Sequence, residues 1–521
     1  MNAPRLVQLG KLGARPQAPR WLVPLRFRPV AGEVLLTNQA GDHVFVTEAE
    51  LAELFRGEVA EDSLLHERLR AAHFVHDAAA GERMVERLRA RKRFLDYGPN
   101  LHIMVVTLRC NETCVYCHAS RADMDATETD MTPETAERVV DTILCSTSPS
   151  VTIEFQGGEP LVNFPVIRHV VEYAEEKNRA HGKQLEFTMV SNLSLMDEDK
   201  LAYLLDKRVQ ICTSIDGPPA LHDRQRKLPL VRSAGASQAV PTGETGAYAA
   251  AARWMARINE AYAAMGLDPV LYHVEALITL TREALAHPRA IVDTYLGLGC
   301  RAIFLRPLDP FGFAAKTGHR VGYEVEEYLA FYREAVDYIL ELNRKGEQVL
   351  ERFAALFLTK ILSGEDPNYL DIRNPCGAAI GQLAYDFDGR IYTCDEGRML
   401  GRMGDGFFAI GQAGETRYRE LMTHETVRAM VVASNLDGQP DCTSCTYNPY
   451  CGVCPVHSYA TQGSIFGRMR ESHLCAVHKG IQDYLFGKLR HADPETRAIL
   501  ERWTTIRPRT HFIQACASPG A

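Results

Sequence analysis

The sequence predicts an α/β fold in which a partial (β/α)6 barrel carries a small N-terminal α+β domain and a C-terminal cysteine-rich domain. Three observations lead to it: apolar runs alternate with helical segments between residues 100 and 310, a β-hairpin pattern precedes them, and cysteines crowd the region after residue 375. At 521 residues the chain is long enough for several cores. The domains expected are a hairpin and helix domain at 20–95, the barrel at 100–310, a helical linker at 311–370, the cysteine-rich domain at 371–480, and a helix and tail at 481–521.

The composition indicates a globular chain, with 46% hydrophobic and 24% charged residues. A formal net charge of −8 argues against a nucleic-acid partner, which needs a basic surface. The sequence holds no apolar run long enough to span a bilayer, so no membrane partner is expected. The first 20 residues lack the continuous apolar segment of a secretory signal, yet the chain has 14 cysteines. Cysteines kept in a reducing compartment usually bind metal or do chemistry, which favours a cytoplasmic metalloprotein.

Residues 33–75 predict a β-hairpin followed by two short helices. Two β-prone runs, 34–37 and 44–47, flank a turn-rich segment. Apolar residues then recur at helical spacing in 48–55 and 63–74. This pattern looks like the small domains that hold the leader sequences of ribosomally made peptides, which bind by adding a strand to a sheet edge. An N-terminal cap packed on the catalytic domain is an alternative that the residues leave open, and it does not exclude peptide binding.

The barrel is predicted from six apolar runs that are typical of parallel strands buried on both faces. We expect these strands at 102–108, 151–155, 185–191, 209–215, 273–279 and 302–305. Helices are expected between them at 133–144, 166–176, 197–205, 247–263 and 282–296. Thr132 precedes a proline at the first helical position, which is a helix-start signal. Ligands of parallel sheets collect at the carboxyl ends of the strands, so functional residues are sought there.

Cys110, Cys114 and Cys117 follow the first of these strands directly. Three thiolates can bind three irons of a 4Fe–4S cluster and leave the fourth iron without a protein ligand. The spacing, with Tyr116 before the last cysteine, resembles the signature of the radical SAM superfamily. The resemblance implies that the open iron binds S-adenosylmethionine (SAM) and that reductive cleavage gives a 5′-deoxyadenosyl radical. A zinc knuckle that used His118 would place two ligands next to each other and strain a tetrahedral site.

Polar motifs stand at the ends of the next strands. Two glycines in the run 156–160 allow a close backbone approach, and the acid beside them can accept a hydrogen bond from the methionine ammonium of SAM. This run resembles the superfamily's methionine-binding motif, and 214–218 resembles the Ser-x-Asp-Gly-Pro segment of peptide-modifying members. A helix cap at 191–192 and an Asx turn at 214–218 are the structural alternatives. The resemblance assigns SAM contacts to Tyr116, Gly157, Gly158, Glu159, Ser191, Asn192, Ser214 and Asp216.

Two further stretches of the barrel point toward a peptide substrate. Residues 224–246 form a Gly-, Ser- and Pro-bearing insertion of the kind that often contacts substrate. The run 304–313, taken with the N-terminal hairpin pattern, resembles the radical SAM maturases of His-Xaa-Ser peptide systems.

The C-terminal cysteines look like those of the SPASM domain, an extension that carries auxiliary iron–sulfur clusters in many radical SAM enzymes. The resemblance implies one cluster at Cys376, Cys394 and Cys454, with a fourth iron that is open or capped by another residue. It implies a second cluster at Cys442, Cys445, Cys451 and Cys475. The last pair departs from the usual spacing, since two residues and not three separate Cys451 from Cys454. A zinc ribbon that uses 442, 445, 451 and 454 is the alternative, but its central gap is short.

Asp395 follows Cys394 directly and is the candidate catalytic base, because the matching aspartate has that role in sulfatase-maturing relatives. An ordinary ion pair with Arg398 is the competing interpretation. The cysteines at 145, 212 and 300 are expected to be small core residues, and Cys516 fits no pattern.

The sequence therefore predicts a radical SAM enzyme that modifies a ribosomally made precursor peptide, typically by oxidative crosslinking. Its expected cofactors are the SAM-binding 4Fe–4S cluster, two auxiliary clusters and SAM itself. Its expected partners are the precursor peptide, a flavodoxin- or ferredoxin-type electron donor and a second maturase. A sulfatase-type maturase that forms formylglycine is one alternative, and a non-catalytic metal-binding partner that holds a leader peptide is another.

Overall fold

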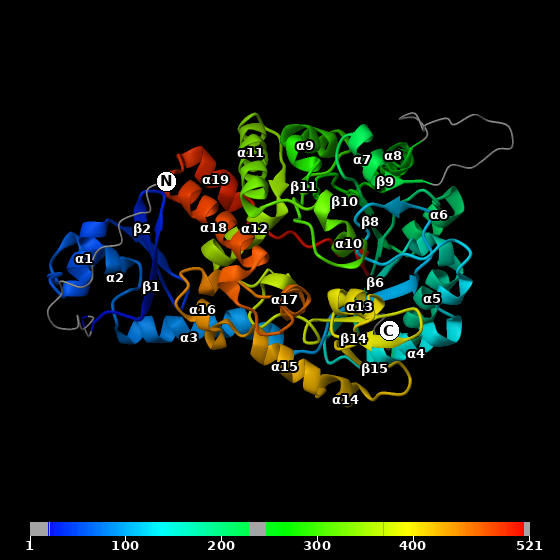
Figure 1. The fold of residues 1–521 in the computed structure, drawn as a ribbon, viewed down its shortest axis with the longest axis horizontal. Coiled ribbons are helices and arrows are strands. Elements are labelled where there is room, and N and C mark those ends of the chain that lie inside the picture. Colours follow the sequence, from blue (N-terminus) through cyan, green and yellow to red (C-terminus); the bar gives the residue numbers. More distant parts are fainter. Residues whose placement is uncertain (1–18, 20, 229–245, 368, 515–521) are drawn as a thin grey trace.

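The computed structural model describes residue 19 and residues 21–228, 246–367 and 369–514. Most of the expected substrate-contacting insertion, Cys516 and the tail beyond residue 514 lie outside the described residues. Figure 1 shows the N-terminal sheet at one end of the molecule, the barrel at the other, and the cysteine-rich segments between and below them. None of the described helices is both long and apolar enough to cross a lipid bilayer.

The helices and strands have the following bounds. The helices are α1 (Glu48–Arg56), α2 (Leu64–Ala71), α3 (Ala78–Lys92), α4 (Pro133–Leu144), α5 (Phe164–His181), α6 (Glu198–Asp206), α7 (Pro219–Gln225), α8 (Ala247–Ala264), α9 (Pro288–Gly297), α10 (Gly312–Val321), α11 (Val325–Arg344), α12 (Arg352–Leu358), α13 (Asp395–Arg402), α14 (Tyr418–Met422), α15 (Glu425–Ser434), α16 (Pro440–Thr443), α17 (Pro455–Gln462), α18 (His473–His491) and α19 (Pro494–Arg502). The strands are β1 (Leu25–Val30), β2 (Glu33–Asn38), β3 (His43–Val46), β4 (Leu101–Thr107), β5 (Thr113–Cys114), β6 (Ser150–Gly157), β7 (Gln184–Val190), β8 (Gln210–Ser214), β9 (Arg226–Lys227), β10 (Glu275–Leu277), β11 (Ala302–Ile303), β12 (Leu350–Glu351), β13 (Gln382–Tyr385), β14 (Arg390–Tyr392), β15 (Ala409–Gln412) and β16 (Ile513–Gln514).

The expected hairpin is β2 and β3, and the structure adds β1 to form an antiparallel sheet in the order β1-β2-β3. Helix α1 begins with a capping box, in which Thr47 and Glu50 satisfy each other's backbone N–H groups. Alternate residues of β2, Val34 and Leu36, are buried in a small core with residues of α1 and α2. Because side chains alternate between the two faces of a strand, one face of this sheet packs against α1 and α2.

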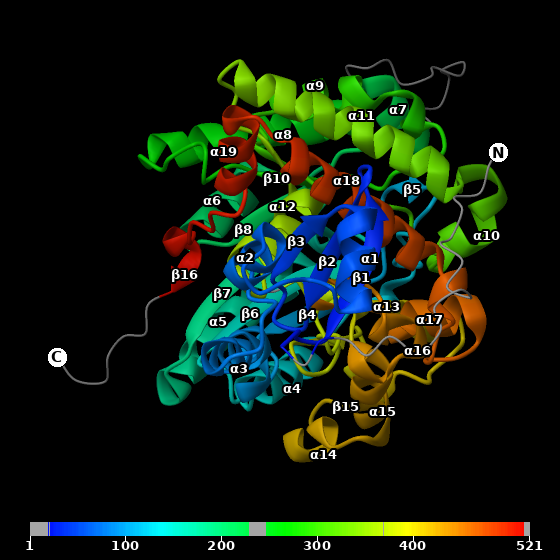
Figure 2. The same ribbon diagram turned by 90° about the vertical axis from the view of Figure 1, so that its left-hand side faces the viewer.

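The N-terminal sheet docks on the cysteine-rich region, as Figure 2 shows from its end of the molecule. The Arg28 guanidinium donates two hydrogen bonds of 2.8 Å to the Asp483 carboxylate on α18. The Tyr450 hydroxyl donates to the carbonyl of Gly41 at 2.9 Å, and Phe45 packs edge-on against Phe486. The hairpin therefore packs as a cap beside the loop that carries Cys442, Cys445 and Cys451.

The main sheet follows the order β10-β8-β7-β6-β4-β13-β14-β15, with β16 added along β7. The strands from β10 to β4 are parallel neighbours, which is the arrangement that alternation of strands and helices predicts. The sixth predicted strand, β11, pairs instead with β12, which returns after α11. The carboxylate of Glu351 on β12 accepts from the N–H of Leu305 at 3.2 Å and so holds this pairing.

The cysteine-rich region shares the sheet of the barrel. Strand β13 runs parallel to β4, and β14 and β15 continue from it in antiparallel order. The boundary expected at 310–371 therefore separates the barrel from the cysteine-rich region along the sequence. In space the two regions share one continuous sheet. The boundary expected at 480 falls inside α18.

Two smaller expectations need correction. The helix expected from 282 starts at Pro288, because proline fits the first helical position and ends the preceding turn. Cys145 is exposed at the end of α4, so it is no core residue, whereas Cys300 is buried.

Candidate active site

The loop that carries Cys110 is held against the end of β6 by backbone contacts. The N–H of Gly158 donates to the carbonyl of Thr107 at 2.9 Å, and the N–H of Glu159 donates to the carbonyl of Arg109 at 2.8 Å. A Cβ at Gly157 would stand 2.1 Å from the Thr107 oxygen, and one at Gly158 would stand 2.3 Å from the Leu108 oxygen. The absence of side chains at these two glycines therefore lets the cysteine loop of the protein itself pack against the strand end. The sequence had suggested that the glycines make room for a ligand.

Glu159 is fully buried and its carboxylate is used within the chain. One oxygen accepts from the Ser191 hydroxyl at 2.7 Å and the Leu161 N–H at 3.0 Å, and the other accepts from the Asn192 N–H at 2.7 Å. Burial raises the pKa of Glu159 to about 7, although these hydrogen bonds act to lower it. The expected residues Glu159, Ser191 and Asn192 are thus in contact. However, the Glu159 carboxylate accepts hydrogen bonds within the chain and links the ends of two strands, whereas the sequence predicted that it accepts from SAM.

Asn192 connects this junction to the cysteine loop. Its side-chain N–H group lies 4.0 Å from the Cys110 sulfur and donates to Asn111 at 3.1 Å. The N–H of Glu112 also points at the Cys110 sulfur, at 3.4 Å. Amide groups directed at a sulfur stabilise a thiolate and are common around iron–sulfur clusters.

A buried polar network lies on the other side of the loop. The Tyr116 hydroxyl donates to the Asp216 carboxylate at 2.5 Å, and the Arg226 guanidinium donates to the same carboxylate at 3.2 Å. Arg226 also lies 3.8 Å from the Cys114 sulfur. Ser214 ends β8 in register with Leu277, close in sequence to Asp216.

Arg226 is a residue that the sequence reasoning missed. It is brought to the site by a short antiparallel ribbon, in which β9 pairs with β5 and Arg226 stands opposite Cys114. A single arginine ten residues after Asp216 has no spacing that marks it, so only the pairing of β5 with β9 could have found it.

The run 304–313 leads into α10, which holds the far end of the cysteine loop. The N–H of Phe313 donates to the Cys117 carbonyl at 2.7 Å, and the Thr317 hydroxyl donates to the Val115 carbonyl at 2.9 Å. Gly312 has φ +58°, and a Cβ there would stand 2.4 Å from the Cys117 oxygen. The stretch that carried part of the family resemblance therefore fixes the third cysteine.

Cys376, Cys394 and Cys454 lie together in one buried cluster with Ile103 of β4. The N–H of Gly397 points at the Cys394 sulfur and that of His457 points at the Cys454 sulfur, each at 3.4 Å. Both cysteines precede helices, α13 and α17, whose first N–H groups are free for such contacts.

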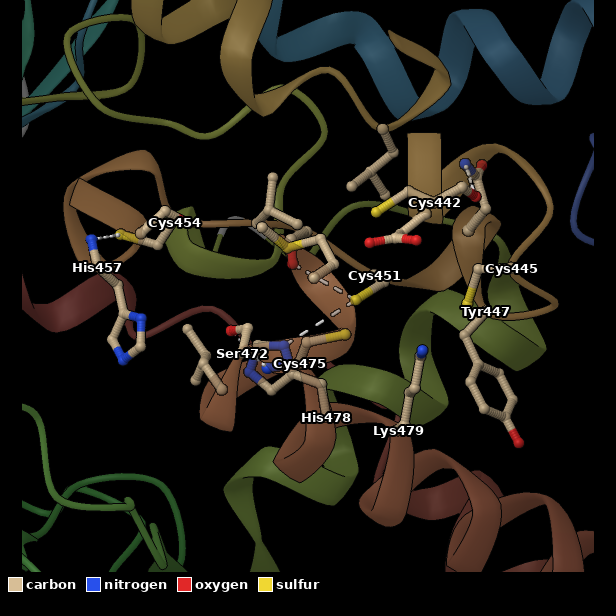
Figure 3. A pocket seen from close by; sticks show the side chains of 18 residues that line it. Cys442, Cys445, Tyr447, Cys451, Cys454, His457, Ser472, Cys475, His478 and Lys479 are labelled. Carbon is tan, nitrogen blue, oxygen red and sulfur yellow. Dashed lines mark hydrogen bonds between the residues drawn. The ribbon is translucent and has the colours of Figure 1, made fainter. Parts of the chain in front are cut away.

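The other four C-terminal cysteines line one pocket, and Cys454 also contributes to its lining. Figure 3 shows the sulfurs of Cys442, Cys445, Cys451 and Cys475 directed toward a common space, with Cys454 on the far side next to His457. The charges of these four thiols act on one another, since Cys442 and Cys445 both contribute to the burial-raised pKa of Cys451. The geometry separates Cys454 from the set that a zinc ribbon would need.

Asp395 is buried and forms an ion pair with Arg398 at 2.7 Å, at the start of α13. This is the competing interpretation that the sequence left open. Its neighbour Glu396 lines a small pocket with Arg306, Asp371 and Cys454. Burial, followed by the charge of Asp371, raises the pKa of Glu396 to about 8.

The cysteine groups fit iron–sulfur clusters in their donor chemistry. The thirteen cysteines among the described residues are all free thiols. Burial raises the pKa of the Cys376 and Cys442 thiols to about 12, so a positively charged metal centre is needed to hold them as thiolates. In the described part of the chain, no three His, Cys, Asp or Glu side chains converge on a single metal ion. A 4Fe–4S cluster instead takes its thiolates at separate corners.

Residues 104–232 match the family described as the radical SAM superfamily. The chain carries a radical SAM domain. The match includes the cysteine loop, the Gly157–Gly158 junction and Arg226, and it confirms the predicted resemblance of this segment to the radical SAM superfamily.

Several curated proteins are similar to parts of this chain. The uncharacterized protein MJ0907 of Methanocaldococcus jannaschii is 30% identical over 22% of this chain and 38% of its own length. The radical SAM cyclopropyl synthase TigE of Paramaledivibacter caminithermalis is 29% identical over 23% of this chain and 27% of its own length. The chain thus spans less than half of these two relatives. A cysteine-type anaerobic sulfatase-maturating enzyme of Clostridium perfringens is 21% identical over 73% of this chain and 94% of its own length.

Two solved structures share the fold. Native anSMEcpe with bound AdoMet superposes with a TM-score of 0.60 at 18% identity, and the match covers 77% of this chain and 99% of that one. Streptococcus suis SuiB bound to S-adenosylmethionine gives a TM-score of 0.50 at 15% identity, over 86% and 98% of the two chains. These matches confirm the α/β barrel with its added N-terminal and cysteine-rich segments.

Proposed function

We propose that this chain reductively cleaves SAM and uses the resulting radical to modify a precursor peptide by oxidative crosslinking. The observation that carries the proposal is the position of Cys110, Cys114 and Cys117 at the end of β4 within the radical SAM match. A 4Fe–4S cluster bound there supplies the electron that cleaves SAM to a 5′-deoxyadenosyl radical.

The residues around the loop position and shield this chemistry. Cys110, Cys114 and Cys117 would hold the cluster, while the N–H of Glu112 and the amide of Asn192 stabilise the Cys110 thiolate. Arg226 supplies positive charge beside Cys114 and orients Asp216, which in turn fixes the Tyr116 hydroxyl. The backbone at Gly157 and Gly158 keeps the cysteine loop against the strand end.

The peptide substrate is supported by the fold and by the names of the relatives. TigE and SuiB resemble this chain in sequence or fold, and native anSMEcpe, which shares the fold, has been solved with a bound Cp18Cys peptide. We assign Cys376, Cys394 and Cys454 to one auxiliary cluster and the other four C-terminal cysteines to another. The cap of β1 to β3 is the leader-binding candidate. The electron donor would be a flavodoxin or ferredoxin of the cytoplasm, and a second maturase would join it.

Anaerobic reconstitution with iron and sulfide, followed by SAM and dithionite, tests the reaction directly. Wild-type protein is expected to release 5′-deoxyadenosine, and the Cys114→Ala variant is not. Coexpression with a precursor peptide encoded beside the chain should then lower the peptide mass by two hydrogens for each crosslink formed. An absence of 5′-deoxyadenosine from reconstituted wild type would overturn the proposal in favour of a non-catalytic metal-binding partner.

A sulfatase-type maturase is the second candidate, since the Clostridium perfringens enzyme matches over 94% of its length. The ion pair between Asp395 and Arg398 weighs against it, because the candidate base is already engaged. An aldehyde trapped on the product by a hydrazine reagent, in place of a crosslink, would decide for this candidate.

A further inference from the structure

Glu154 is a carboxylate in the middle of β6 that the proposed reaction leaves without a role. Ile153 and Phe155 beside it are fully buried in the apolar core. Side chains alternate along a strand, so Glu154 and Gln156 lie on the opposite face, toward the barrel interior. Glu154 therefore lies on the face of β6 opposite to the apolar core residues Ile153 and Phe155.

Strand register places Glu154 beside the first auxiliary cysteine group. Its partner on β4 is Ile103, which packs in the same buried cluster as Cys376, Cys394 and Cys454. Directly paired residues of neighbouring strands share a face. Burial raises the pKa of Glu154, and the charge of Asp395 raises it further, so the start of α13 also lies within electrostatic range.

The two oxygens of Glu154 have only neutral partners among the described residues. Gln156 donates to one oxygen at 2.5 Å, and Thr188 of β7 donates to the other at 3.2 Å. A carboxylate offers about four acceptor positions, so each oxygen can accept again. The positive charge of Arg352 lowers the pKa of Glu154, but the Arg352 guanidinium donates its hydrogen bond to Glu275, at 2.9 Å.

The charged side chains around the barrel interior form their ion pairs with groups other than Glu154. The ion pairs there join Arg352 and Arg509 to Glu275, Arg306 to Asp309 and Glu396, and Arg398 to Asp395. No salt bridge within the described residues includes Glu154. Glu154 is half-buried and has no ion-pair partner in the described part of the chain, so a ligand that brings hydrogen-bond donors and positive charge would be bound there preferentially.

We propose that Glu154 determines the specificity of the peptide site by binding a basic side chain of the substrate, an imidazole, an ammonium or a guanidinium. The inference rests on the proposed peptide-modifying function and names the class of side chain that enters the barrel. Each of these groups carries N–H donors that form charge-assisted hydrogen bonds with a carboxylate. An acidic side chain in the same position would be rejected by like charge.

Capped tripeptides N-acetyl-Gly-Xaa-Gly-amide, with Xaa as His, Lys, Leu or Glu, test this specificity. Their binding to the reconstituted enzyme with SAM is measured anaerobically by equilibrium dialysis. Wild type should bind the His and Lys peptides about tenfold or more tightly than the Leu peptide, as a charge-assisted hydrogen bond implies. Glu154→Gln should lose this preference, and Glu154→Lys should prefer the Glu peptide. Glu154→Asp, which keeps the charge, should keep the preference for basic residues.

Glu186→Gln is the matched control. Glu186 is a carboxylate on the adjacent strand β7, two residues before Thr188. It accepts a hydrogen bond from the Thr152 hydroxyl at 3.3 Å, and both residues lie two positions nearer the start of their strands than Glu154 and Thr188. Its variant should retain the wild-type preference. Equal affinity of wild type for the four peptides, or no binding of the basic ones up to their solubility limit, would overturn the inference. Neither result touches the proposed function, which fails separately if wild type releases no 5′-deoxyadenosine.

Discussion

Cys114 and Arg226 stand opposite each other in the two-residue ribbon of β5 and β9, with the guanidinium 3.8 Å from the sulfur. The same guanidinium lies 3.2 Å from Asp216 and 3.9 Å from Glu112, both of which are almost fully buried. Positive charge from one side chain therefore faces a thiol and two carboxyl groups at the place where the cluster would bind.

Replacing Arg226 with Gln should destabilise the protein by about 3–5 kcal/mol, because buried Asp216 would lose its cation. The reduction potential of the cluster should also fall, since removal of a nearby positive charge disfavours the more negative reduced state. Chemical denaturation and a potentiometric titration followed by electron paramagnetic resonance measure the two effects.

Arg224→Gln is the control for this change. Arg224 lies two residues earlier, with about half of its side chain exposed, and pairs with Glu283 at the surface. An exposed pair contributes about 0–1 kcal/mol, so this variant should keep both stability and potential near wild type. If both variants gave the same potential, Arg226 would have no electrostatic role at the cluster.

Gly158→Ala should displace the cysteine loop. The new Cβ would stand 2.3 Å from the Leu108 oxygen and 2.4 Å from the Arg109 oxygen, and backbone atoms cannot give way as a flexible side chain does. We expect a loss of about 1–3 kcal/mol in stability and a larger loss of SAM cleavage. Gly297→Ala, at the end of α9 with nothing within 4 Å, should be close to neutral. A Gly158→Ala variant with wild-type 5′-deoxyadenosine release would contradict the close approach.

Local patterns in the sequence were sufficient for the parts of the fold that depend on neighbouring residues. The strand before Cys110, the helix after Thr132 and the polar strand ends at Glu159 and Asp216 occur where hydrophobic periodicity and capping residues predict them. These features depend on residues that are close in sequence, so a single sequence is enough to predict them.

Pairings between distant segments could not be predicted in this way. Strand β13 pairs with β4, although the paired residues, such as Gln382 and Leu101, are more than 280 positions apart, and β11 pairs with β12 outside the main sheet. Backbone hydrogen bonds do not depend on residue type, so no local signal distinguishes these pairings. Arg226 was missed for the same reason, since its role exists only through the pairing of β9 with β5.

Cysteine replacements should separate the two C-terminal groups. Cys445→Ala should remove about four irons per chain, one 4Fe–4S cluster, while the signals of the other clusters remain. Cys394→Ala should remove a different cluster, because Cys394 lies in the buried group with Cys376 and Cys454. Cys145→Ala is the control, since Cys145 is exposed. Iron and sulfide analysis with electron paramagnetic resonance of the reduced proteins distinguishes the variants, and identical spectra for Cys394→Ala and Cys445→Ala would contradict the division.

His102 should make the protein sensitive to acid. It is fully buried on β4, where its ring contacts the Tyr385 hydroxyl of β13 at 3.1 Å and the Pro99 carbonyl at 3.2 Å. Burial lowers its pKa from 6.5 to about 3, so between these values the unfolded chain binds a proton that the folded protein does not. Stability should therefore fall as pH decreases below 6.5, by up to about 1.4 kcal/mol per pH unit, until the folded form also protonates near pH 3.

The variant His102→Gln should flatten this dependence, because glutamine cannot take up the proton in the unfolded chain. Denaturation midpoints measured from neutral pH to about pH 4 would show a smaller acid loss than in wild type, although the variant starts from lower stability through its changed contact with Tyr385. His181→Gln, at the exposed end of α5, should reproduce the wild-type slope. Equal slopes for His102→Gln and wild type would mean that other buried groups, and not the link between β4 and β13, set the response to acid.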